Sequence, residues 1–286
     1  MCKNLTHCST HGCTAATFTP VEDDWVEVPA AERGGRGRWQ CPYHAQVVYG
    51  YSDENSTRSG KNLDGFTYSV EFEVDDPSAV LRSTLMHYKW MPTHDCTVDC
   101  EFKSPIYNNL KWHKLLDTVE DILTNDGGCV SRRCGTHFHV GNRYHINEDT
   151  MGRIRFGYAE LFLPLSDHLA ANPAKCRALF GRELNDWAEP IHEYTWCREH
   201  TNFINVQHDA TLEFRMCKFR TAAQYKLAME FCKDTVKAII NQYLSNWYNK
   251  GTFGDVAEAY RLHKAECVGR HLVKLFERYA AKAMNL

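Results

Sequence analysis

The sequence has no long apolar run and no excess of charge of one sign, and both absences narrow what the protein can do. No stretch approaches the roughly 18 consecutive apolar residues of a membrane span, and Met1 to His7 lacks the apolar core of a signal peptide. A formal net charge of -3, from 33 Lys and Arg against 36 Asp and Glu, gives no overall attraction to nucleic acid or to an anionic membrane. We therefore expect a cytoplasmic protein with no membrane partner, and nucleic acid is not indicated as a partner.

Two further patterns are missing. The Gly-x-x-x-x-Gly-Lys-Ser/Thr loop that cradles phosphates in many nucleotide-binding proteins does not occur, and we find no internal repeat. The 13 cysteines are an odd number, which is typical of reduced thiols and a metal site rather than of a secreted disulfide framework. At 286 residues, with 43% hydrophobic and 12% aromatic residues, the chain suits one large domain with a small appendage.

Residues 1–48 have the pattern of a small zinc module. Two close pairs of thiolate and imidazole ligands let two tight turns converge on one Zn²⁺ ion, as in a zinc ribbon or a treble clef. Four protein ligands leave no open position, so we expect structural zinc and a module that docks to a protein partner or substrate. The polar residues 49–62 predict a linker, and 63–286 form the main domain. The predicted zinc ligands are Cys8, Cys13, Cys41 and His44, with Cys2, His7 and His11 competing for the same role.

Periodicity predicts both strands and helices in the main domain. Alternating apolar residues indicate strands over 67–74, 98–102 and 136–141, and a hairpin of 203–206 with 211–219. Apolar residues at helical spacing predict helices over 108–125, 149–171, 222–248 and 256–284, and a shorter helical or irregular segment over 173–187.

Four of the predicted strands each carry two charged or metal-ligating side chains that are separated by one residue. Successive side chains of a strand point to opposite faces, so the two members of each pair share a face. Carboxylates and imidazoles on one face of a sheet are ligands for divalent cations, whereas an ordinary solvated face would carry Lys, Ser or Thr. The pairs are Glu71 and Glu73, Asp99 and Glu101, His137 and His139, and Glu213 and Arg215.

These pairs predict a site for metal-bound nucleotide. Mg²⁺ prefers oxygen ligands and uses a few carboxylates together with substrate phosphates. The glutamates, with a histidine completing the shell, would hold two or more Mg²⁺ ions against a nucleoside triphosphate. Without a phosphate-binding loop, arginines would contact the phosphates; the candidates are Arg215, Arg132 and Arg133.

The order of these segments resembles the amidoligase family of carboxylate-amine ligases, within the glutamine synthetase and glutamate-cysteine ligase superfamily. The resemblance covers about residues 65–245. It is most specific in the segments 134–141 (Cys-Gly-Thr-His-Phe-His-Val-Gly) and 211–215 (Thr-Leu-Glu-Phe-Arg). It implies an α+β catalytic domain over 63–286, whose mostly antiparallel, ligand-lined sheet is backed by helices as in glutamine synthetase, and which uses ATP and Mg²⁺. The implied metal ligands are Glu71, Glu73, Glu101 and Glu213, and Arg215 contacts the transferred phosphate. One histidine of the His137 and His139 pair contacts metal or phosphate; we place His139 with the metal ligands and His137 with the nucleotide contacts, and which of the two binds metal stays open.

By this resemblance the protein joins an acid to an amine by way of an acyl phosphate. Neither the acid nor the amine is specified by the sequence: small molecules, peptides and modified polymers all fit. Candidate acceptors of the amine proton are Asp95, Asp99 and His139. Two other hypotheses remain open: a zinc-dependent hydrolase that uses His137 and His139, and a non-catalytic assembly protein that uses the zinc module.

Overall fold

The structure analysed is a computed structural model of the whole chain. It describes residues 65–88, 90–93, 98–107, 134–185, 188–191, 201–218, 221–245 and 254–286, together with the backbone of four residue pairs nearer the N-terminus. Those pairs form two short antiparallel ladders. One joins β1 (Thr6–His7) to β2 (Ala16–Thr17), and the other joins β3 (Val26–Glu27) to β4 (Trp39–Gln40).

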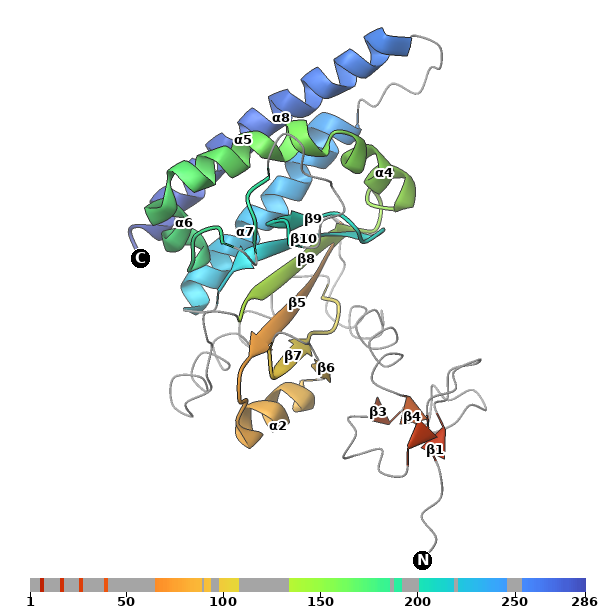
Figure 1. Cartoon of the computed structure of the whole chain (residues 1–286), viewed down its shortest axis with the longest axis vertical. Coiled ribbons are helices and arrows are strands. Elements are labelled where there is room, and N and C mark those ends of the chain that lie inside the picture. Colours follow the sequence, from red (N-terminus) through yellow and green to blue (C-terminus); the bar gives the residue numbers. More distant parts are fainter. Residues whose placement is uncertain are drawn as a thin grey trace, which may run out of the picture.

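A six-stranded antiparallel sheet is the centre of the fold (Figure 1). Its strand order is β6-β7-β5-β8-β10-β9, so that β5 and β8 lie in the middle. The strands are β5 (Phe66–Val74), β6 (Met91–Thr93), β7 (Cys100–Lys103), β8 (Thr136–Asn142), β9 (Ile204–Asn205) and β10 (Thr211–Cys217).

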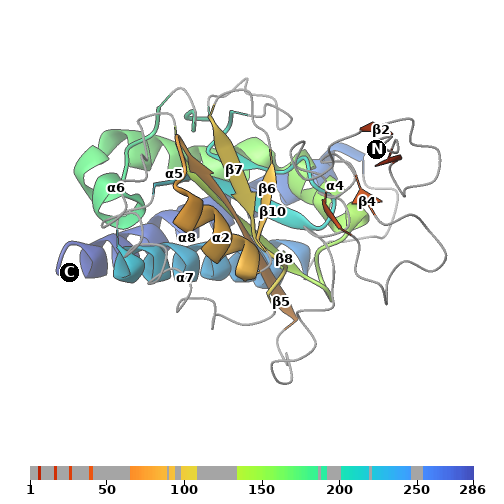
Figure 2. The same cartoon turned by 90° about the horizontal axis from the view of Figure 1, so that it is seen from below.

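Alternation along the strands gives the sheet two different faces. On β5 the side chains of Phe66, Tyr68, Val70, Phe72 and Val74 are all buried in the hydrophobic core, and the residues between them point the other way. Figure 2 looks onto the sheet from below, with the helical layer behind it. The apolar face is therefore covered by helices, and the charged residues lie on the opposite face.

The helical layer consists of α4 to α8. Its members are α4 (Glu148–Phe156), α5 (Tyr158–Ala171), α6 (Pro173–Phe180), α7 (Ala222–Ala238), the π-helix η4 (Ile239–Leu244) and α8 (Gly254–Ala283). Helix α7 packs on the sheet through Tyr225, whose ring meets Phe138 edge to face at 5.3 Å between centroids and whose hydroxyl donates to Thr136. Phe180, Phe231 and Phe276 join α6, α7 and α8 in one aromatic cluster.

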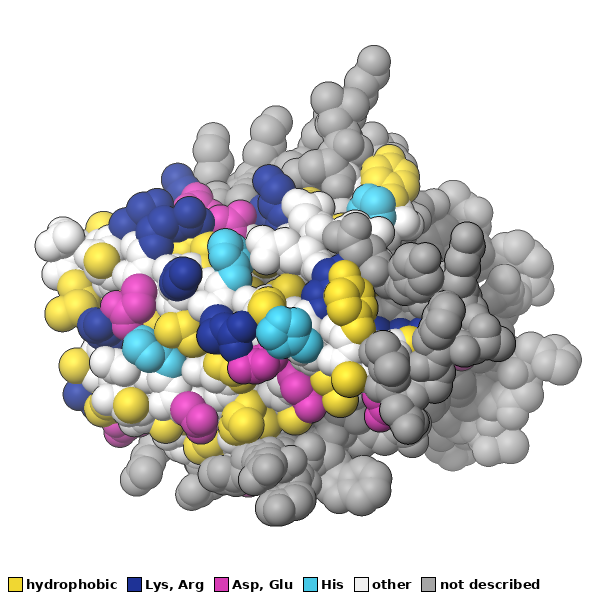
Figure 3. Space-filling view, turned by 90° about the horizontal axis from the view of Figure 1, so that it is seen from above, with side chains coloured by type: hydrophobic (Ala, Val, Ile, Leu, Met, Phe, Trp, Pro, Cys, Tyr) yellow, Lys and Arg dark blue, Asp and Glu magenta, His cyan; other side chains and the backbone are white. Residues whose placement is uncertain are grey.

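Helices α5 and α8 approach each other closely at Gly269. A Cβ at this position would lie 2.6 Å from the carbonyl oxygen of Glu160 and 2.9 Å from that of Leu161, so only glycine fits without a shift. The outer side of the layer mixes basic, acidic, histidine and apolar side chains without a large patch of one kind (Figure 3). No helix among the described ranges combines the length and the apolar character needed to cross a bilayer.

The expected α+β architecture, an antiparallel sheet backed by helices, is confirmed. The structure differs from the sequence prediction in several places. It adds α2 (Ala79–His87) and β6, which were not predicted. It divides the expected helix 149–171 at Gly157, where a Cβ would lie 2.5 Å from the Tyr243 hydroxyl. The expected helix 222–248 continues from α7 as the π-helix η4.

Several predictions fall outside the described residues. The predicted helix 108–125 does, and so do the linker 49–62 and the four predicted zinc ligands Cys8, Cys13, Cys41 and His44.

Candidate functional site

The polar face of the sheet gathers charged side chains from four adjacent strands. The antiparallel register places Glu71 of β5 between Lys103 of β7 and His137 of β8, and it places His139 opposite Glu213 of β10. The alternation of side chains predicted that the two members of each pair share a face, and the order of the strands brings all of these residues except Asp99 close together. We call this set the carboxylate cluster: Glu71, Glu73, Glu101, His137, His139 and Glu213.

Every member of the carboxylate cluster is shielded from water. Glu73, Glu101, His137, His139 and Glu213 are between 2% and 6% exposed, and the Glu71 side chain is 16% exposed. Charged groups are rarely buried to this degree unless they are paired with one another or bind a metal ion. The cluster therefore needs partners of opposite charge.

Glu71 lies at the centre of the cluster. One of its oxygens, Oε1, is 2.8 Å from the Lys103 ammonium and 3.3 Å from His139 Nε2, and the other, Oε2, is 3.2 Å from His137 Nδ1. Lys103 also reaches Glu101 Oε2 at 3.4 Å, so that one ammonium lies between two carboxylates. Thr93 donates to the same Glu101 oxygen at 2.9 Å.

Glu213 is held from three sides at the other end of the cluster. Arg215 donates to its Oε1 at 2.6 Å, and Asn205 donates to its Oε2 at 2.8 Å. His208, in the turn between β9 and β10, lies 3.3 Å from Oε2, and its ring meets that of His139 at 5.1 Å between centroids. His208 thus joins the site from a loop rather than from a strand.

Arg155 of α4 fixes the turn that carries His208. Its guanidinium donates to the carbonyl oxygens of Val206 and Gln207, each at 2.8 Å, and to that of His208 at 3.3 Å. It also pairs with Asp209 at 2.8 Å. Four contacts from one planar group leave the turn little freedom, so Arg155 orients His208 towards Glu213 without touching the cluster itself.

The pKa values of the cluster reflect burial and mutual charge. Burial and the negative charge of Glu71 raise the pKa of Glu101 to about 8. Burial opposes the charged forms of Glu71 and His139 too, but attraction between this carboxylate and imidazolium lowers the pKa of Glu71 and raises that of His139. In Glu213 the hydrogen bond from His208 and the charge of His139 outweigh burial, so that its pKa is also lowered.

Among the carboxylate cluster and His208, two groups of three residues have their possible metal-ligand atoms close together. In each group the ligand atoms lie within 4.8 Å of one another. The first, Glu71, Glu101 and His137, offers two carboxylates and one imidazole, which fits Mg²⁺ or Mn²⁺. The second, His139, His208 and Glu213, is richer in nitrogen. The two predicted histidines therefore belong to different groups.

The structure does not bring every predicted residue to the cluster. Asp99 precedes β7, is exposed, and accepts a hydrogen bond from the backbone of Asp76 at 2.9 Å, so its side chain is engaged outside the cluster. Its expected place beside Glu101 is wrong, because β7 begins only at Cys100. Asp95, Arg132 and Arg133 lie outside the described residues.

Three residues around the cluster were not predicted. Lys103 is two positions from Glu101 on the same strand, so strand alternation alone would have found it. His208 sits in the predicted hairpin turn, and its proximity to Glu213 follows once the register of Asn205 opposite Glu213 is known. Arg182 follows α6 in a segment without any motif, and nothing in the sequence indicates that it reaches the sheet.

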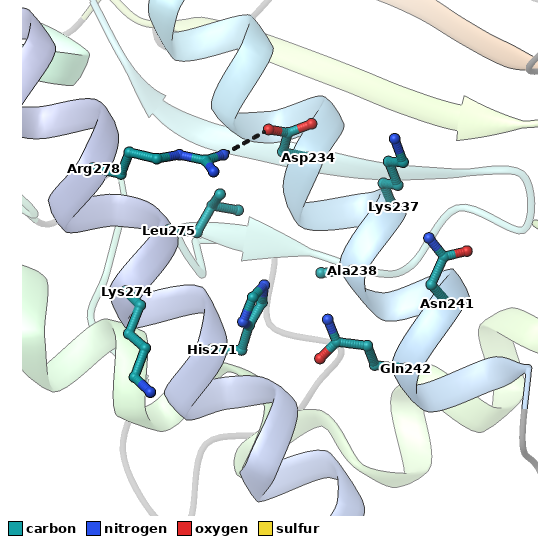
Figure 4. Close-up of a pocket in the computed structure, with 9 residues that line it drawn as sticks. All are labelled: Asp234, Lys237, Ala238, Asn241, Gln242, His271, Lys274, Leu275 and Arg278. Carbon is teal, nitrogen blue, oxygen red and sulfur yellow. Dashed lines mark hydrogen bonds and ion pairs between the residues drawn. The ribbon is translucent and has the colours of Figure 1, made fainter.

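A separate groove lies in the helical layer between α7, η4 and α8 (Figure 4). It has a volume of about 490 Å³, and Ala238 and Leu275 are its buried lining residues. Arg278 pairs there with Asp234 at 3.0 Å. The remaining lining residues are exposed and polar: Lys237, Asn241, Gln242, His271 and Lys274. None of the groove residues belongs to the carboxylate cluster.

No family model matches the chain, and no curated protein matches it.

Proposed function

We propose that this protein is an ATP-dependent carboxylate-amine ligase that forms an amide bond through an acyl phosphate. One observation carries the proposal: two three-residue ligand groups lie side by side, five of their six residues on one sheet face and His208 on the adjoining turn, with Arg215 between them. Two adjacent groups with this mixture of oxygen and nitrogen suit metal-bound triphosphate better than they suit a single structural ion. The resemblance to the amidoligase family agrees with this arrangement.

The proposed reaction has two steps. A carboxylate oxygen of the acid attacks the terminal phosphorus of ATP, the bond from that phosphorus to the bridging oxygen breaks, and ADP leaves. The amine nitrogen then attacks the acyl carbon, phosphate leaves, and the nitrogen loses a proton. The net products are the amide, ADP and phosphate.

Different residues of the cluster would have different roles. Glu71, Glu101 and His137 would hold one Mg²⁺ ion, and Glu213 with His139 and His208 would hold a second divalent cation, while Glu73 borders the first group. Bound Mg²⁺ would neutralise charge on the phosphates.

Arg215 would orient the transferred phosphoryl group. Its guanidinium is buried and lies 3.5 Å from His137 Nδ1, between the two metal groups. Of the two predicted proton acceptors that the structure describes, Asp99 and His139, His139 lies in the cluster.

We further propose that the sheet and its helices form a glutamine synthetase-like catalytic domain, and that residues 1–48 bind one structural zinc ion. Zinc analysis of the whole protein tests the second part. The content is expected to fall by one ion per chain after Cys41→Ser, and an unchanged content contradicts the module.

One observation favours a second candidate function. His139, His208 and Glu213 are the two-histidine, one-glutamate set that holds catalytic zinc in many hydrolases. A zinc-dependent hydrolase would use this group with a water nucleophile. It would leave Glu71, Glu101 and Arg215 without a direct role, which is why we place it second.

The test measures ADP release with Mg-ATP across panels of acids and amines. Ligation requires both organic substrates, and the rate is expected to fall at least a hundredfold, about 2.7 kcal/mol of transition-state stabilisation, in both Glu71→Gln and Arg215→Ala. Matched controls are Glu266→Gln and Arg270→Ala, because these two residues form an exposed ion pair on α8. ATP-independent cleavage that requires zinc would instead support the hydrolase.

A further inference from the structure

The groove between α7, η4 and α8 is a basic hollow on a slightly acidic protein. Among the nine described residues that line it, Lys237, Lys274 and Arg278 are cations and Asp234 is the one acid, so the lining carries two net positive charges. The whole chain has a formal net charge of -3. A local excess of positive charge in a hollow attracts anions from solution whatever the sign of the total charge.

The acid of the groove is already paired, whereas its lysines are open to solvent. Asp234 Oδ2 accepts hydrogen bonds from the Arg278 guanidinium at 3.0 Å and from the Tyr279 hydroxyl at 2.9 Å. Lys237 and Lys274 are exposed, and neither forms an ion pair with any residue in the part of the chain that the structure describes. Both ammonium groups are therefore available to a ligand, and their long stems let them reach it.

The neutral lining residues add hydrogen-bond donors. Asn241 and Gln242 belong to the π-helix η4, in which the Ser245 amide donates to the Ile240 carbonyl, five residues earlier, at 2.9 Å. Such π-helical turns are rare and are frequent at functional sites. Figure 4 shows Gln242 and His271 extending from facing helices into the space between them. Amide and imidazole groups donate to anion oxygens without adding charge.

The floor and the size of the groove favour a small, hydrophilic ligand. Its apolar lining residues are Ala238 and Leu275, each 6% exposed, so the described lining offers little apolar surface to anchor a docking peptide. The volume of about 490 Å³ is within the range of small-molecule sites. The cations come from both walls, Lys237 from α7 and Lys274 and Arg278 from α8, which suits a ligand with several linked anionic groups.

We propose that this groove binds the polyphosphate chain of a small molecule, at a site separate from the carboxylate cluster. Lys237 and Lys274 would hold the chain from opposite walls, and Arg278 would contact one end of it. The lining supplies the positive charge itself, so that binding needs no metal ion. The carboxylate cluster, by contrast, repels an anion unless a cation is bound there.

The experiment measures binding of inorganic triphosphate by calorimetry in the presence of EDTA, which keeps the carboxylate cluster free of metal. Wild type is compared with the double variant Lys237→Gln, Lys274→Gln. The matched control is the double variant Lys226→Gln, Arg270→Gln, which removes two charges from exposed positions of the same two helices outside the groove. A further variant, Gln242→Glu, adds a negative charge to the groove with almost no change of shape.

We expect the groove double variant and Gln242→Glu to bind triphosphate about tenfold more weakly or less, and the control to behave as wild type. Asp234→Asn should bind it more tightly, because this change releases Arg278 from its ion pair. Damage to the fold cannot produce tighter binding, so this variant separates charge from stability. ATP that binds with the same dependence on the two lysines identifies a nucleotide as the source of the chain, and ATP that does not identifies inorganic polyphosphate.

Three outcomes overturn the inference. The first is no binding of triphosphate by wild type in EDTA, and the second is equal weakening by the control double variant. The third is groove-dependent binding of hexaglutamate in place of triphosphate, which would assign the groove to an acidic protein segment. None of these substitutions touches the carboxylate cluster, so ADP release judges the proposed ligase separately.

Discussion

Replacing Lys103 with methionine removes the ammonium that lies between Glu71 and Glu101. At 2.8 Å, and with an effective dielectric constant of about 20, attraction between Lys103 and Glu71 amounts to about 6 kcal/mol. Dehydration of both groups offsets more than half of this value. Since Glu101 keeps its proton up to about pH 8, it adds little at neutral pH. We expect the free energy of unfolding of metal-free Lys103→Met to fall by about 2–3 kcal/mol.

Mg²⁺ should reverse this loss. In the proposed site the ammonium and Mg²⁺ would compete for the same two carboxylates, so the variant is expected to bind Mg²⁺ more tightly and to gain more stability from it than wild type does. Urea unfolding followed by circular dichroism, with and without saturating Mg²⁺, measures both effects. A matched control is Lys175→Met, which removes a half-exposed ion pair with Glu277 and should cost about 0–1 kcal/mol whatever the Mg²⁺ concentration. A stability gap between wild type and Lys103→Met that is unchanged by Mg²⁺ would refute the placement of a metal at Glu71 and Glu101.

Three further predictions test the pH dependence, the turn and the packing. Below pH 8 Mg²⁺ must displace the proton of Glu101, so its affinity should rise by up to about tenfold per pH unit from pH 6 to 8 and then level off in calorimetry; a flat profile contradicts this. Arg155→Ala frees the turn that carries His208 and should weaken Zn²⁺ or Mn²⁺ binding at the second group about tenfold or more, with no change at the first. Gly269→Ala should lower the free energy of unfolding by about 1–3 kcal/mol because its Cβ meets α5. Gly152→Ala, with nothing within 4 Å of its Cβ, should raise it by up to about 1 kcal/mol, and equal effects at the two glycines would contradict the close contact.

The strands and the residues that share a face could be predicted from the sequence, because the alternation of side chains between the two faces of a strand depends only on neighbouring residues. Glu71 and Glu73, or His137 and His139, occupy one face whatever the rest of the chain does, and the bounds of β5 and β8 agree with the predicted strands to within one residue. Which strands lie next to one another in the sheet, by contrast, depends on residues that are far apart in the sequence. The positions of β6, which contains Pro92, and of α2 depend on contacts that no short window of sequence contains.

The difference between local patterns and long-range contacts also explains which residues of the site could be predicted. The members of the carboxylate cluster were predicted because each belongs to a strand with an alternating pattern. Arg182 was missed because it comes from a connection between helix and sheet, and only the folded chain shows that its guanidinium reaches Arg215. The bulge in β10 is also invisible in sequence. There the register with β8 shifts between Phe214 and Cys217, next to Arg215.

The edges of the sheet have a consequence for self-association. The outermost strands, β6 and β9, have three and two residues, and β6 contains Pro92, which has no amide hydrogen to donate. Long, flat edges invite another chain to add a strand, and very short or proline-containing edges discourage it. The described edges of this six-stranded sheet therefore offer little backbone through which two concentrated molecules could merge their sheets, even though the inner strands are long enough to pair.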